Sequence, residues 1–323
     1  MHRAAVMCSV LAAGCVPAVA QAQTPVAPAA PPPVAAAMTL TVDRAGGARA
    51  TTLVGSRLRV RGASPAFAPG ESVVVRFFVA GRKRAVRRVA LQPGAAGGGA
   101  IRVAYVPTRP GPLTISVTHD ASPTIGPFVA TAPRVDVLPR RVTSRSGGAS
   151  IRALQRRLRR LGYVTGTRGS FDARTGRAVL AFRKVTGMAR TSRASIGVMR
   201  ALARGRGGFR IRFPAHGRHI EADLSRQVIA LVEGGRARRI YPVSSGTPST
   251  PTVVGSFKVY SKTAGTNAKG MLDAAYFFGG YATHGYPSVP VYPASHGCLR
   301  VPIPDARSLF RWIRVGTPVD VYP

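Results

Sequence analysis

The chain has 323 residues and a mass of 33.9 kDa, which suits two or three domains rather than one small core. Its 47 Lys and Arg against 11 Asp and Glu give a formal net charge of +36, so the surface favours anionic partners. The basic residues, mostly arginine, are spread along the sequence without the cluster that is typical of a compact nucleic-acid reader. We therefore expect no nucleic-acid partner.

The first 22 residues have the pattern of an export signal. A basic start and a short apolar stretch are followed by the small-residue sequence AVAQA at 18–22. We predict a signal peptide over 1–22 and a protein secreted to the cell wall or periplasm, where the anionic partners are wall polymers or membrane headgroups. An alternative is a lipoprotein anchored through Cys15, because residues 11–15 resemble a lipobox. No later run reaches the roughly 20 apolar residues of a membrane-spanning helix, so we expect no integral span.

Two segments of different composition follow. Residues 23–38 are almost all Ala, Pro and Val and predict an extended linker. Over residues 39–138, short alternating segments such as 58–61, 101–105 and 113–117 are separated by Pro-Gly turns. This spacing predicts an immunoglobulin-like β-sandwich.

The period then changes from strand to helix. Residues 139–147 are a basic, Ser/Gly-rich linker, and 148–204 predict a small three-helix bundle. The apolar residues at helical spacing are Ile151, Leu154, Leu158 and Leu161, then Val179, Phe182 and Val185 after Asp172, then Ile196, Met199 and Leu202. In order and type, the segments 151–155, 161–163 and 169–182 resemble the peptidoglycan-binding module of wall hydrolases. The family's usual Asp-Gly pair is replaced by Gly169-Ser170.

Strand patterns return over residues 209–323. The expected elements are strands at 220–224, 228–232 and 239–243, a hairpin turn at Gly234-Gly235, and one helix at 304–314. The sequence therefore predicts a mostly-β C-terminal domain.

One cysteine stands out in this domain. Cysteines occur at positions 8, 15 and 298, so removal of a signal peptide leaves Cys298, either as an inert buried residue or as a reactive thiol. A thiol nucleophile needs a base, and His284, fourteen residues earlier, and His296 are both candidates. Gly297 removes side-chain bulk where backbone N–H groups could hold an oxyanion. The residues predict a thiol acyl-transfer site with no cofactor, because no ligand cluster has zinc-like spacing.

The region around the thiol resembles the catalytic domain of the L,D-transpeptidases of the YkuD type. The family pattern is a histidine and, after a loop, Ser/Thr-His-Gly-Cys with Arg or Asn shortly beyond, matched by His284 and by Ser295 through Arg300. Weaker positions match at Asp223, Ser225 and Gln227, at 244–246, Thr250-Pro251, 255–257, Met271, Phe278, Asp305-Ala306 and 316–319. His216 and His219 match no family position, and we expect both at the surface.

The resemblance implies roles and a substrate. His284 would be the base, Cys298 the nucleophile, and Ser295, His296 and Gly297 would shape the site. Arg300 would bind a stem carboxylate or form a structural ion pair. The implied partners are donor and acceptor stem peptides of peptidoglycan, which the enzyme would cross-link through a thioester. The alternatives are a carboxypeptidase that uses the same site with water, and a wall-binding structural protein whose catalytic domain is vestigial.

Overall fold

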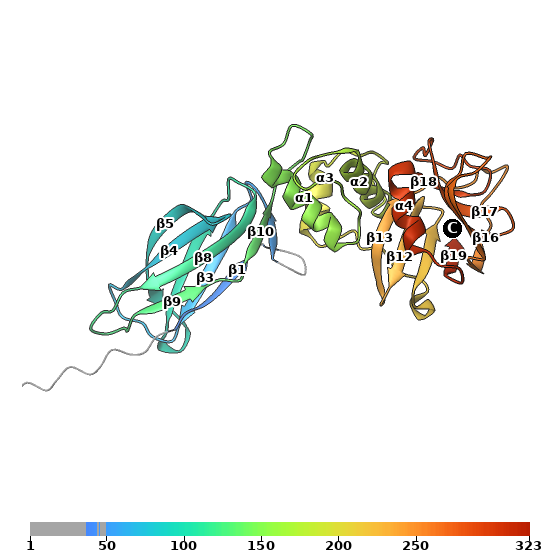
Figure 1. The fold of residues 1–323 in the computed structure, drawn as a ribbon. Helices are drawn as coiled ribbons and strands as arrows, with labels where there is room; N and C mark the ends of the chain where they lie inside the picture. Colours follow the sequence, from blue (N-terminus) through green and yellow to red (C-terminus); the bar gives the residue numbers. More distant parts are fainter. Residues whose placement is uncertain (1–36, 44, 46–49) are drawn as a thin grey trace, which may run out of the picture.

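The computed structural model describes residues 37–323 except 44 and 46–49. The predicted signal peptide over 1–22, Cys8, Cys15 and most of the 23–38 linker lie outside the described residues. The described chain is elongated, with a β-rich part at one end, helices in the middle and a second β-rich part at the other end (Figure 1). None of the helices in these residues is long and apolar enough to cross a bilayer.

The N-terminal part consists of two sheets around one core. Its elements are β1 (Thr39–Asp43), β2 (Thr51–Leu53), β3 (Leu58–Ser64), β4 (Ser72–Val79), β5 (Arg82–Ala90), β6 (Gln92–Pro93), a 3-10 turn (Ala95–Gly97), β7 (Gly99–Tyr105), β8 (Gly111–His119), β9 (Phe128–Thr131) and β10 (Val135–Leu138). One sheet has the order β1-β3-β7-β6 and the other β2-β10-β8-β4-β5, with β9 beside β8. Alternate residues of β3 and β4 are buried, because one face of each strand turns to the core that Val60, Phe77 and Ile115 share. The expected strands at 58–61, 101–105 and 113–117 are confirmed within β3, β7 and β8.

Three helices follow, at the expected places: α1 (Gly148–Arg160), α2 (Ala173–Val185) and α3 (Ile196–Ala203). Asp172 caps α2, since its carboxylate accepts the Thr175 N–H at 2.8 Å. The loop between α1 and α2 is tied down by Gln155, which is fully buried. Its amide donates to two loop carbonyls at 2.8 and 2.9 Å and accepts the Gly169 N–H at 2.9 Å.

The C-terminal part is mostly β, as predicted. Its elements are a 3-10 turn (Pro214–His216), β11 (His219–Asp223), β12 (Val228–Glu233), β13 (Arg236–Pro242), β14 (Gly255–Lys258), β15 (Ser261–Thr266), β16 (Leu272–Phe278), β17 (Tyr281–Tyr286), β18 (Leu299–Pro302), α4 (Ile303–Trp312) and β19 (Pro318–Tyr322). One sheet has the order β13-β12-β11-β19-β14 and the other β15-β16-β17-β18. Gly234 and Gly235 both have positive φ, +59° and +66°, which the two-residue hairpin turn between β12 and β13 requires.

The helices are joined to the C-terminal part by a shared core. Leu154 and Phe182 belong to the same apolar cluster as Val228 and Ile240 of β12 and β13. Lys184 of α2 is buried at this junction and donates to two carbonyl oxygens of the C-terminal part, both at 3.0 Å. Helices and sheet are therefore packed as one body, not as units on a flexible tether.

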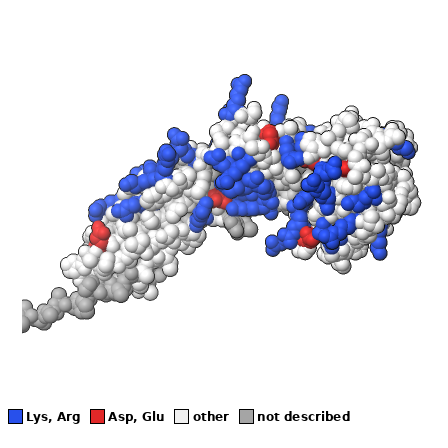
Figure 2. Space-filling model, viewed as in Figure 1, with Lys and Arg blue, Asp and Glu red and all other residues white. Residues whose placement is uncertain are grey.

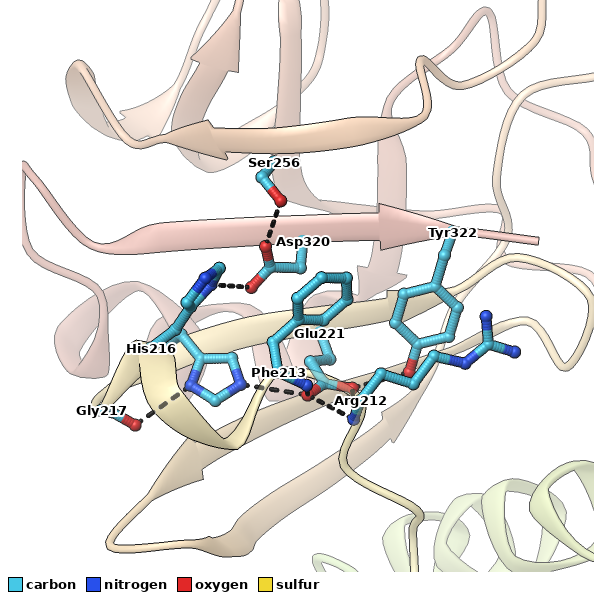
Figure 3. Close-up of polar contacts among 9 residues, drawn as sticks. Arg212, Phe213, His216, Gly217, Glu221, Ser256, Asp320 and Tyr322 are labelled. Atoms are coloured by element: carbon cyan, nitrogen blue, oxygen red, sulfur yellow. Dashed lines mark hydrogen bonds and ion pairs between the residues drawn. The ribbon is translucent and has the colours of Figure 1, made fainter.

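A buried polar network lies at the start and end of the C-terminal part (Figure 3). Glu221 is fully buried and accepts hydrogen bonds from His219 Nε2 at 3.1 Å and from the Tyr322 hydroxyl at 2.7 Å. Burial works to raise the pKa of Glu221, but hydrogen bonds led by two backbone N–H groups outweigh it and hold this pKa below its usual value. His216 is exposed, as expected. The expectation for His219 was wrong: its ring is buried, because both ring nitrogens find oxygen partners inside the fold, Glu221 and the Gly217 carbonyl.

Candidate active site

Two parallel neighbouring strands bring the predicted histidine and cysteine together. β17 and β18 pair in parallel, with Thr283 opposite Leu299 and His284 opposite Arg300. Cys298 immediately precedes β18, so it stands one residue before Leu299, the first residue of β18 that pairs with β17. The thirteen residues between His284 and Cys298 form the loop that connects these two strands, and the imidazole and the thiol belong to one end of one sheet.

Both side chains open into a single hollow of about 570 Å³. Of the predicted site residues, Ser295, His296 and Arg300 line it together with Cys298 and His284. The other lining residues are Asn267, Ala268, Lys269, Met271, Tyr276, Gly280 and Tyr286. Among the described residues no group of three or more His, Cys, Asp or Glu side chains is placed to hold a metal ion.

The thiol of Cys298 lines this hollow and is half-buried. Cys298 Sγ lies 3.6 Å from the Gly280 carbonyl oxygen. Burial raises the pKa of the Cys298 thiol, while a hydrogen bond from the Ala282 backbone and the charges of Arg300 and Lys269 lower it by less. The resting group is a neutral thiol, so nucleophilic chemistry here needs a base that removes its proton.

His284 has the properties of such a base. It is 2% exposed, and its Nδ1 lies 3.0 Å from the Gly285 carbonyl oxygen, which can only accept. Nδ1 therefore carries the hydrogen in the neutral ring and Nε2 keeps its lone pair. Burial lowers the pKa of His284, the bond to Gly285 opposes this, and the nearby Arg300 charge lowers it further. The imidazole is thus neutral and able to accept a proton.

The turn before the cysteine is shaped by a serine and a glycine. Ser295, which is buried, donates from its hydroxyl to the Cys298 carbonyl oxygen at 2.6 Å and accepts the Gly297 N–H at 3.1 Å. Gly297 has φ +115°, and a Cβ there would lie 2.4 Å from the Tyr281 ring. Thr252 holds the same turn by donating to the Gly297 carbonyl at 2.7 Å. Position 297 therefore requires glycine, and its N–H is already engaged within the turn.

Arg300 and His296 form one wall of the hollow. The Arg300 guanidinium carbon lies 4.1 Å above the Tyr286 ring centre, and Nη1 donates to the Ala294 carbonyl at 2.9 Å. Arg300 makes no salt bridge with any carboxylate of the described chain, so the structural ion pair considered from the sequence is not formed. Its remaining N–H groups are available to the hollow. His296 is exposed at the rim and has no such anchoring.

The sequence reasoning missed Lys269 and Tyr286. Lys269 lies in the loop between β15 and β16, where Asn267 Oδ1 accepts the N–H groups of Lys269 and Met271, both at 3.0 Å. Gly270, with φ +70°, completes this tight turn. An Asn two positions before a Lys-Gly pair is a turn signal that could have been read, but only the fold shows that the turn borders the thiol.

Comparison with known protein families gives two matches to this chain. The L,D-transpeptidase catalytic domain family matches residues 217–321, and a peptidoglycan binding domain family matches residues 147–202. Comparison with curated protein sequences gives no significant match.

One solved structure agrees with the family matches, and two others are more distantly similar. The chain is 34% identical to an L,D-transpeptidase from Xylanimonas cellulosilytica, with a TM-score of 0.50, over 57% of this chain and 98% of that one. An L,D-transpeptidase from Stackebrandtia nassauensis is 20% identical over 56% of this chain and 95% of that one, with a TM-score of 0.35. The C442S mutant of the Enterococcus faecium L,D-transpeptidase is 24% identical over 39% of this chain and 62% of that one, with a TM-score of 0.30.

The fold, the hollow and these matches define the class: a mostly-β domain of the kind that acts on cell-wall peptides, packed on a peptidoglycan-binding module. The chain belongs to the L,D-transpeptidase family of the YkuD type.

Proposed function

We propose that this protein is an exported peptidoglycan L,D-transpeptidase that works through a thioester on Cys298. The observation that carries the proposal is the pairing, in one hollow, of a half-buried neutral thiol with a buried imidazole whose Nε2 keeps its lone pair. The sulfur attacks the carbonyl of the L-centre of the third residue in a donor stem and expels the terminal D-alanine. An amine of a neighbouring stem then takes the acyl group and forms the cross-link.

His284 moves the protons of both steps. Nε2 takes the thiol proton as the C–S bond forms and gives it to the amine of the departing D-alanine as the C–N bond breaks. In the second step Nε2 takes a proton from the attacking amine and returns it to the sulfur when the thioester breaks. The hydrogen bond from Nδ1 to Gly285 supports this role, because it holds the ring in the tautomer that the reaction needs.

The oxyanion and the substrate carboxylate need partners of their own. The Gly297 N–H donates to Ser295, so we assign the oxyanion to the backbone N–H of Cys298 itself, with His296 at the rim. Arg300 and Lys269 line the hollow and supply positive charge to a stem carboxylate. Arg300 is the better placed of the two, because the Tyr286 ring and the Ala294 carbonyl hold its guanidinium.

The remaining domains are assigned to delivery and attachment. We assign residues 1–22 to a signal peptide, 39–138 to an immunoglobulin-like β domain, and 148–204 to a three-helix peptidoglycan-binding module next to the 209–323 catalytic domain. Support comes from the shared core of the two N-terminal sheets and from the cluster that joins the helices to β12 and β13. Such a protein would act in the cell wall and contribute to its organisation and to cell shape.

The direct test uses disaccharide-tetrapeptide muropeptides with the purified protein and with Cys298→Ala, followed by mass spectrometry of the products. A dimer that lacks one D-alanine and forms only with Cys298 intact is the expected result. A monomeric tripeptide without dimer would make the protein a carboxypeptidase with water as acceptor. No turnover with several stem chemistries would leave a wall-binding protein with a vestigial catalytic domain.

A further inference from the structure

Two adjoining hollows in the N-terminal β domain are lined by arginine. The first, about 370 Å³, lies over β3 and β7, and the second, about 660 Å³, lies between β5 and the end of β7. Both include Arg57 and Ala104, so they form one continuous trough. Its six arginines are Arg57, Arg59, Arg61, Arg84, Arg87 and Arg102, all of them exposed, and no Asp or Glu lines either hollow. Figure 2 shows the same imbalance over the visible face of this end of the molecule, where Lys and Arg far outnumber Asp and Glu.

The positive charges of the trough are hardly compensated within the protein. Arg61 Nε lies 2.6 Å from Asp43, and none of the other five arginines makes a salt bridge with a carboxylate of the described chain. In the pairing of β3 with β7, Arg61 stands directly opposite Arg102. Like charges in direct opposition on a sheet are destabilising. An anion in the trough removes this repulsion.

The spacing of the arginines indicates a polymer with regular charges. Arg59 and Arg61 occupy alternate positions along β3, so their backbones follow one another at about 6–7 Å, and Arg57 immediately precedes this strand. Phosphates joined through a three-carbon polyol have a comparable repeat. For nucleobases the trough offers a single aromatic ring, Tyr105, and one face of that ring is already stacked on Phe77 at 4.3 Å between ring centres.

We propose that this trough is a binding site for a linear polyol phosphodiester polymer, independent of the hollow that contains Cys298. The arginine forks bind successive phosphates, and the neutral polyol links lie between them. Binding then releases counterions and weakens steeply as salt rises. The site attaches the β-domain end of the molecule to an anionic polymer, while β18, which Cys298 immediately precedes, lies toward the opposite end (Figure 1).

The test measures binding of fluorescent poly(glycerol phosphate) to the full chain by anisotropy over a series of salt concentrations. The site variant is Arg57→Gln, Arg84→Gln and Arg87→Gln. The matched control is Arg82→Gln, Lys83→Gln and Arg88→Gln, which removes the same charge from the same β domain at exposed positions outside both hollows. The single variant Arg57→Gln serves if the triple site variant does not fold.

We expect the site variant to bind about tenfold or more weakly at low salt and to lower the slope of log K against log salt by about two. The control should change affinity less than about twofold, and both variants should retain the muropeptide activity of the parent chain. Equal weakening by the two triple variants would overturn the proposal, since net charge alone would then explain binding. It would also be overturned if single-stranded DNA of equal phosphate number, or phosphatidylglycerol vesicles, bound more tightly than the polyol polymer.

Discussion

The hydroxyl of Ser295 donates to the carbonyl oxygen of Cys298 at 2.6 Å, so the residue before the His-Gly pair holds the backbone of the thiol itself. The Ser295 hydroxyl oxygen also accepts the Gly297 N–H, at 3.1 Å. Ser295→Ala removes both contacts and leaves a buried N–H without this acceptor, which costs about 1–3 kcal/mol. We expect a matching drop in the free energy of unfolding in urea and a fall in kcat of tenfold or more, because the sulfur loses its orientation.

Ser249→Ala is the control for this change, since Ser249 is exposed and its hydroxyl contacts only another hydroxyl, that of Thr247. Its stability and kcat should match those of the parent. If Ser295→Ala kept the parent's kcat, the serine would not be a positioning residue for the thiol.

The conformation of Gly297 predicts a severe effect of the smallest substitution. An alanine there combines φ +115° with a Cβ 2.4 Å from the Tyr281 ring, so the turn before Cys298 has to move. We expect Gly297→Ala to lose at least a hundredfold in kcat/KM. Gly208→Ala, where a Cβ meets nothing within 4 Å and φ is not positive, should behave as the parent. Near-normal turnover of Gly297→Ala would show that the turn can relax without disturbing the thiol.

The fall of kcat/KM at acid pH, the acid limb of the pH profile, should report the protonation of His284. Burial and the Arg300 charge lower the pKa of His284 below its usual 6.5, so the neutral base persists to lower pH and the limb of kcat/KM lies below pH 6.5. Arg300→Gln removes a positive neighbour, so the limb should move to higher pH. His284→Gln should abolish the limb and cost about 10²–10⁴ in rate. A limb that stays in place in Arg300→Gln would contradict this electrostatic account.

Lys184 predicts a pH dependence of stability. Burial, with a smaller effect of the Arg190 charge, lowers its pKa to about 7. In the unfolded chain the amine keeps its usual pKa near 10.5, so between about pH 7 and 10.5 the unfolded state binds a proton that the folded state does not. Lys184 therefore adds a rise of stability with pH in that window, at most about 1.4 kcal/mol per unit.

The measurement is urea unfolding of the parent and of Lys184→Met from pH 7 to 10.5. The stability of the parent relative to the variant should increase with pH, and Lys83→Met, at an exposed strand position, should show no such trend. A constant difference across the window would mean that the amine stays charged between its two carbonyl partners.

Local signals in the sequence were sufficient for much of the fold. Asp172 starts a helix because its short carboxylate reaches the free N–H groups of the first turn, whatever the helix packs against. Gly234-Gly235 makes a hairpin turn because both positions need positive φ. The order of Ser295 to Arg300 was likewise enough to identify the family, since a motif is a property of the chain and not of its packing.

Burial could not be predicted in the same way. His219 was expected at the surface, yet its ring is satisfied by Glu221, which in turn depends on Tyr322 about a hundred residues later. Both partners of the ring, Gly217 and Glu221, lie only two residues away, so the linear pattern lacks the burial and not the partners: β11 is buried because β12 and the distant β19 pair with its two edges.

The sequence by itself determined the family, and it was sufficient to propose the thiol and the candidate bases, because each depends on residue type and order. Tertiary structure decided what those groups can do. The parallel pairing of β17 with β18 brings Cys298 and His284 to one hollow, and the Gly285 carbonyl selects the tautomer. Arginines that look evenly spread along the chain gather in one trough, because alternate residues of a strand share a face and neighbouring strands align those faces. Distance in space, desolvation and the partners of each polar atom arise only when the strands are assembled.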